Sequence, residues 1–98
     1  MAIPPQNAWA DELNDRLKEA ERDEINFSVE DGRLTATYVF DPEGDWSGEK
    51  SLARAVELLT IRYFGLTAFR MRPDQRFEVK YQLWNEEDDP RAHILSKL

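Results

Sequence analysis

The chain has 98 residues, 41% of them hydrophobic, and carries 20 acidic against 13 basic side chains, for a net charge of −7. A chain this short builds one core, so a single domain over residues 1–98 is expected. The absence of cysteine excludes disulfide bonds and thiolate chemistry and fits a reducing compartment. No stretch offers the roughly 20 apolar residues that cross a bilayer, and residues 2–10 lack the features of a secretory signal. A cytoplasmic protein with no membrane partner is therefore predicted.

The negative charge is unevenly distributed. Residues 1–50 carry thirteen acids and five bases (−8), whereas residues 51–98 carry seven acids and eight bases (+1). Between Arg62 and Trp84, five bases stand against two acids. The overall acidity argues against binding to nucleic acid or to anionic membranes, because phosphate groups would be repelled at long range.

The first predicted element is an amphipathic helix. Pro4 and Pro5 indicate an extended start over residues 1–6, and Asn7 is a favourable N-cap. Apolar residues then recur at helical spacing up to a predicted end near Arg22. They are Trp9, Leu13, Leu17 and Ala20. This stripe is expected to face the core.

The segment INFSVEDGRLTATYVF predicts a β-hairpin. Asp31-Gly32 suits a two-residue turn in which both residues have positive φ. That turn fixes three cross-strand pairs on one buried face: Val29 with Leu34, Phe27 with Ala36, and Ile25 with Tyr38. The opposite face, with Ser28 and Thr35, is expected to meet solvent.

Residues 41–49 are predicted to form a loop that Trp46 anchors to the core. The alternating acids there suggest calcium, but their spacing does not fit an EF-hand loop, so no metal is predicted. A second helix, capped by Ser47 and followed by Gly65 just past its end, is expected to lie deep across the sheet. Its broad apolar arc comprises Leu52, Ala55, Val56, Leu58, Leu59, Ile61 and Tyr63.

The segment from Leu66 to Trp84 predicts a second hairpin with its turn at Pro73-Asp74. Phe69 and Met71 share parity with the apolar residues of the following strand, and the basic residues face the other way. Trp84 falls among the charged side chains, an unusual place for an indole. The alternative extends the second helix to Met71 and leaves one strand.

Residues 85–98 form an acidic tail that we expect to be mobile, because its four consecutive acids repel one another. Alternatively, Ile94, Leu95 and Leu98 dock a short terminal turn onto the body or onto a second subunit, so a homodimer is also considered. In a eukaryotic source, the final Ser96-Lys97-Leu98 would match a peroxisomal import signal.

The predicted fold is α+β, in the order helix, hairpin, helix, hairpin (αββαββ), with one antiparallel sheet and the helices packed on one face. Catalysis is not expected, because the lone His93 has no cysteine partner and no glycine-rich phosphate loop occurs. The size, acidity and alternation of helices with hairpins are similar in style to type III secretion chaperones and small phage-encoded inhibitors of host defence, although no motif supports this likeness. A non-enzymatic binding protein of inhibitor, adaptor or chaperone type, without a cofactor, is predicted.

Two surfaces are candidates for binding the protein partner. The first is an acidic face suited to a basic, nucleic-acid-binding site, and comprises Glu12, Asp15, Glu19, Asp23, Glu86, Glu87, Asp88 and Asp89. The second is the basic hairpin, with Arg70, Arg72, Arg76, Lys80 and Trp84, which would also serve the alternative of a nucleic-acid-associated module. A third alternative is a small ligand-binding or enzymatic domain with a pocket between the second helix and the sheet.

Overall fold

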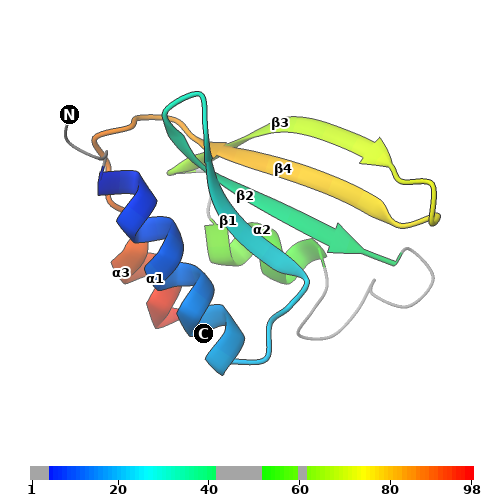
Figure 1. The fold of residues 1–98 in the computed structure, drawn as a ribbon, viewed down its shortest axis with the longest axis horizontal. Helices are drawn as coiled ribbons and strands as arrows, with labels where there is room; N and C mark the ends of the chain where they lie inside the picture. The colour runs from blue at the N-terminus through cyan, green and yellow to red at the C-terminus, as the bar shows by residue number, and fades with distance from the viewer. Residues whose placement is uncertain (1–4, 42–51, 60–61) are drawn as a thin grey trace.

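A computed structural model describes residues 5–41, 52–59 and 62–98. These residues form one four-stranded antiparallel sheet and three helices that lie on one side of it (Figure 1). In chain order the elements are α1 (Pro5–Glu19), β1 (Ile25–Glu30), β2 (Arg33–Phe40), α2 (Leu52–Leu59), β3 (Phe64–Met71), β4 (Phe77–Leu83) and α3 (Arg91–Ser96). The predicted α+β fold is confirmed, and α3 is an addition to it. The residues of the predicted loop, including Trp46 and Ser47, lie outside the described part of the chain.

The first hairpin has the predicted register. Ile25 pairs with Tyr38, Phe27 with Ala36, and Val29 with Leu34. Both turn residues have positive φ, 54° at Asp31 and 76° at Gly32, a conformation that glycine adopts at no steric cost. The apolar residues of these pairs are buried, apart from Val29, which is half-buried against the core.

Thr35 departs from the prediction of a solvent-facing side chain, since only 2% of its surface is exposed. Its hydroxyl donates a hydrogen bond to the Arg33 carbonyl (3.1 Å) and accepts one from Gln82 Nε2 (3.4 Å). Thr35 belongs to an inner strand, so side chains from the neighbouring strands cover it. A polar side chain buried in this way keeps its hydrogen bonds, which offsets the cost of burial.

The second hairpin is formed by two strands, so the alternative in which the second helix continues to Met71 is wrong. Strand β4 pairs with both β2 and β3, and the sheet order is β1-β2-β4-β3. A β-bulge interrupts the pairing between Leu66 and Ala68. Gly65 lies inside β3, paired with Gln82, and does not end the preceding helix as predicted.

Helix α1 begins earlier than predicted. Its first residue is Pro5, so the expected extended segment is wrong for Pro5 and Gln6, and Asn7 lies inside the first turn. Proline is favoured at this first helical position because its missing N–H has no partner there in any case. The helix ends at Glu19 in a Schellman motif, with Glu21 at φ 57° and the Arg22 N–H donating to the Leu17 carbonyl (2.9 Å).

The core fills the space between the sheet and the three helices. Buried strand residues such as Phe27, Tyr38 and Val79 belong to this core. Helices α1, α2 and α3 lie on one side of the sheet (Figure 1). The helices contribute Ala10, Leu13, Leu17, Leu58, Leu59 and Ile94. Trp9 packs against this core but is only half-buried, and Ala20 and Val56, both predicted to face the core, are exposed.

The end of the chain is packed on the domain and includes the helix α3, whereas the sequence predicted a mobile tail. Ile94 is fully buried in the core and Pro90 is buried just before α3. The ring of His93 lies 6.3 Å from that of Tyr63, and its Nε2 lies 3.3 Å from the Glu57 carbonyl oxygen of α2. The alternative in which apolar residues dock the end onto the body is the correct one.

Candidate functional site

The two edges of the sheet differ in how much of the edge strand other elements cover. Helix α1 packs along the edge strand β1, and the side chain of Asn14 bonds to the backbone N–H and C=O of Phe27. At the opposite edge, all six residues from Leu66 to Met71 are exposed. An uncovered edge strand presents unpaired backbone donors and acceptors to any extended chain that approaches it.

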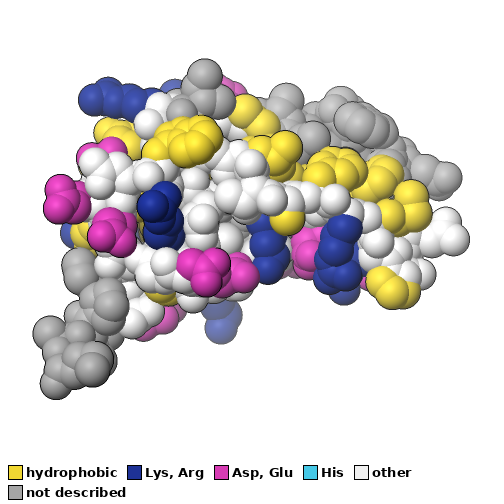
Figure 2. Space-filling view, turned by 90° about the horizontal axis from the view of Figure 1, so that it is seen from above, with side chains coloured by type: hydrophobic (Ala, Val, Ile, Leu, Met, Phe, Trp, Pro, Cys, Tyr) yellow, Lys and Arg dark blue, Asp and Glu magenta, His cyan; other side chains and the backbone are white. Residues whose placement is uncertain are grey.

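Strand β3 also exposes three large apolar side chains: 59% of Leu66, 53% of Phe69 and 61% of Met71. Each is paired across the hairpin with an apolar residue, in the order Tyr81, Val79 and Phe77. They therefore lie on the same face of the sheet as the core. Figure 2 shows hydrophobic side chains close together on the surface, beside basic and acidic ones. We call Leu66, Phe69, Met71 and the β3 backbone the edge surface.

The shape of the edge surface follows from the bulge at Thr67. Its hydroxyl donates to the Lys80 carbonyl at 3.3 Å. The extra residue keeps Leu66 and Phe69 on the same face, although they are three positions apart. The Phe69 ring packs against the Phe77 ring, with centroids 5.2 Å apart. The Phe69 ring is thus held against its neighbour, and all three apolar side chains remain more than half exposed.

The predicted basic residues of this hairpin are largely paired with acids on the other face of the sheet. Arg70 Nε lies 2.6 Å from Glu78 Oε2, and Lys80 Nζ lies 3.0 Å from Glu30 Oε1. The hydrogen bond from Arg70 holds the pKa of the Glu78 carboxyl below its ordinary value. A basic side chain engaged in this way attracts a phosphate less strongly than a free one, so this face gives little support to nucleic-acid binding.

Trp84 is 59% exposed and lies among polar side chains, as its parity predicts. Its ring covers Gly65, where an added Cβ would lie only 2.2 Å from the Trp84 Cη2 atom. Arg33 Nη1 donates to the Trp84 carbonyl at 3.0 Å. Trp84 therefore flanks the edge surface from the opposite face of the sheet.

The predicted acidic face is only partly assembled. Arg91 joins two of its members, with Nη1 2.6 Å from Glu12 Oε2 and Nη2 2.7 Å from Asp89 Oδ2. Glu19 pairs with Arg16 at 3.4 Å, and Asp15 is exposed on the same helix. Because basic side chains lie between these acids, α1 does not present an unbroken negative surface.

The other acids of this set occupy separate positions. The Glu86 carbonyl accepts a hydrogen bond from the Gln6 side chain, which places residues 86–89 beside the start of α1. Glu87 is exposed and Asp88 is half-buried there. Asp23 lies beyond the end of α1, at the opposite end of the helix. The structure therefore brings residues 86–89 beside α1 only near the start of that helix.

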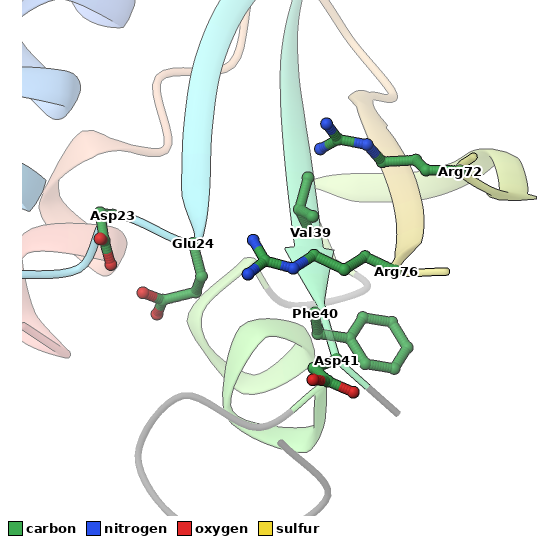
Figure 3. A pocket seen from close by; sticks show the side chains of 7 residues that line it. All are labelled: Asp23, Glu24, Val39, Phe40, Asp41, Arg72 and Arg76. Carbon is green, nitrogen blue, oxygen red and sulfur yellow. The ribbon is translucent and has the colours of Figure 1, made fainter. Parts of the chain in front are cut away.

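A hollow of about 480 Å³ lies where β1 begins and β2 ends (Figure 3). Arg72 and Arg76 reach into it from the β3–β4 turn, over Val39. Its acidic lining residues are Asp23, Glu24 and Asp41. Because both carboxylates and guanidinium groups line it, the site has no strong preference for an anion or for a cation.

The described residues contain no group of three or more His, Asp or Glu side chains placed to hold a metal ion. Among the helices of this part of the chain, none has the length and apolarity to span a membrane. Comparison with protein-family models, curated proteins and solved structures gives no match. A function for this chain is therefore inferred from its own geometry.

The sequence did not reveal the edge surface. Phe69 and Met71 have the parity of core residues, and Leu66 is out of step with them until the bulge is known. The signal that could have revealed it is three large apolar residues, Leu66, Phe69 and Met71, in a strand that has only one neighbouring strand. That adjacency depends on the sheet order, which no local pattern encodes.

Proposed function

We propose that this protein acts without catalysis, by docking on a second polypeptide, and that the edge surface of β3 is where the partner binds. The supporting observation is an edge strand with six consecutive exposed residues, three of them large and apolar. Single exposed apolar residues are common, but three on one face of an uncovered strand form a continuous surface that water solvates poorly.

The mode we propose is strand addition. An extended segment of the partner pairs with the β3 backbone, and its alternate side chains pack on Leu66, Phe69 and Met71. Backbone hydrogen bonds would supply affinity that is independent of sequence, while the apolar side chains select the partner. The contrast with β1 supports this choice, because Asn14 already satisfies the backbone groups of Phe27 at that edge.

The charge of the hairpin suggests the composition of the partner segment. Residues 64–83 carry four bases, Arg70, Arg72, Arg76 and Lys80, and two acids. An apolar segment is therefore favoured, with only a slight preference for acidic residues, because Arg70 and Lys80 are already paired with Glu78 and Glu30. Adaptors and inhibitors work by docking of this kind, and the lack of cysteine fits a cytoplasmic setting.

Selection from a random peptide library displayed on phage tests the proposal. The immobilised protein should select peptides with alternating apolar residues, and these should perturb the amide NMR signals of residues 64–71. The edge variant Leu66→Thr/Phe69→Thr should lose at least tenfold in affinity. Val56→Thr is the matched control, because it makes an exposed apolar residue polar on α2. Peptides that bind the edge variant as tightly as the unchanged protein would refute the proposal.

A further inference from the structure

The sequence of β3 is compatible with pairing to itself. Its core-face residues are Phe64, Leu66, Phe69 and Met71, and its other face has Gly65, Ala68 and Arg70. We propose that, in the free protein, a second copy of this chain occupies the edge surface, with the two β3 strands antiparallel about a two-fold axis at Phe69. This inference rests on the proposed function and names what covers the same site when the partner is absent.

The register follows from the faces of the strand. Directly opposite residues in an antiparallel pair share one face. An axis at Phe69 places the two Phe69 rings opposite each other on the apolar face. It also places Ala68 opposite Arg70 of the partner subunit on the polar face, where each Arg70 keeps its own Glu78 at 2.6 Å. Between residues 68 and 70, each side chain thus meets one of compatible chemistry.

Neighbouring registers are worse for identifiable reasons. An axis at Ala68 would set Leu66 against Arg70 of the partner subunit, which the bulge places on opposite faces. An axis at Arg70 would oppose the two guanidinium groups directly, and an axis at Met71 would oppose Arg70 and Arg72. Like charges directly across a strand pair destabilise it. The axis at Phe69 opposes no like charges, and its one mismatch from the bulge, Leu66 opposite Arg72 of the partner subunit, falls beyond the end of β3 at Met71.

The dimer would be weak and reversible. One strand and three side chains from each copy form an interface below the roughly 1,200 Å² of stable complexes. Pairing nevertheless covers the exposed edge of β3 and the exposed parts of Leu66, Phe69 and Met71. Because both occupants need the same strand, self-association competes with partner binding, and apparent affinity for a partner peptide falls as protein concentration rises.

Sedimentation velocity between about 1 and 500 μM tests self-association, a range chosen to include the micromolar affinities of weak interfaces. We expect a concentration-dependent shift from monomer to dimer. Phe69→Lys should weaken the dimer at least tenfold, because it opposes two charges at the axis. Leu98→Lys, which adds the same charge at an exposed apolar residue far from β3, should leave the shift unchanged (Figure 1).

Disulfide cross-linking tests the register independently, because the unchanged chain has no cysteine. Ala68→Cys and Arg70→Cys proteins are mixed and oxidised. Directly opposite Cα atoms lie about 4.5–5.5 Å apart, within the range of a disulfide, whereas residues two positions out of register lie about 7–8 Å apart. The mixed pair should therefore cross-link faster than either protein alone.

A monomer at every concentration, or equal cross-linking in all three samples, would overturn the inference. Either result leaves the proposed function standing if selected peptides still depend on Leu66 and Phe69. If the protein dimerises but the selected peptides bind without depending on Leu66 and Phe69, the proposed function is refuted and the inferred dimer is not.

Discussion

The side-chain amide of Asn14 makes two hydrogen bonds to the backbone of Phe27, with Nδ2 donating to the carbonyl and Oδ1 accepting from the N–H, both at 2.8 Å. Asn14 is on α1 and Phe27 is on the edge strand β1. One side chain thus imitates a neighbouring strand at the position where the edge would otherwise accept one. This contact occupies β1 at Phe27, whereas residues 66–71 of the opposite edge strand β3 are exposed.

Asn14→Ala should destabilise the fold by about 1–3 kcal/mol, because it leaves two backbone groups of β1 without their partners. Asn7→Ala in the same helix is the control for the gain in helix propensity that alanine brings. Urea unfolding of both variants measures the difference. Equal stability of the two variants would mean that water replaces the Asn14 amide at no cost.

Phe27→Ala should cost about 3–5 kcal/mol, because the ring is fully buried between the sheet and α1 and its removal leaves a cavity. Its ring lies 6.4 Å from that of Phe64 of β3, so Phe64 would line the cavity. Asn26→Ala, at the exposed neighbouring position of β1, is expected to change stability little. A loss below 1 kcal/mol for Phe27→Ala would contradict the packing described for this hairpin.

Ile94→Ala should cost about 2–4 kcal/mol, since no part of the Ile94 side chain is exposed. Deleting residues 90–98 should lower the melting temperature clearly, the reverse of what a mobile tail predicts. Leu98→Ala is the control, because Leu98 is largely outside the core. Thermal unfolding followed by circular dichroism distinguishes the two expectations.

Asp89 gives the docking of α3 a pH dependence. The hydrogen bond from Arg91 lowers the pKa of the Asp89 carboxyl. A carboxyl with a lowered pKa in the folded state stabilises the fold above its ordinary pKa of about 4, and this contribution is lost as the pH falls through the folded value.

Asp89→Asn should therefore cost about 0.5–1 kcal/mol at pH 7, a small effect because the pair is partly exposed. The difference should shrink as the pH is lowered from about 4 towards 2, because the Asp89 carboxyl of the unchanged protein becomes protonated as the pH falls through its folded pKa. Urea unfolding at neutral pH and at the lower end of this range measures it. A difference that is the same at both would show that the Asp89 charge does not stabilise the fold.

The sequence by itself determined the local structure. Residues 25–40 carry both a turn that needs positive φ at Asp31 and Gly32 and an alternation that sorts apolar from polar side chains. These two constraints act over a few residues and agree, so they fix the register without reference to the rest of the chain. The apolar face of α1 followed in the same way from Leu13 and Leu17.

The tertiary structure decided what meets across long sequence separations. The sheet order makes Thr35 an inner residue, although its parity predicted exposure. It leaves Phe69 and Met71 at an edge, although their parity is that of core residues. Likewise, Arg91 neutralises Glu12, 79 positions away. Periodicity states which side of a strand a residue faces, but burial and pairing depend on which element lies against that side. That is settled only when the helices and strands pack together.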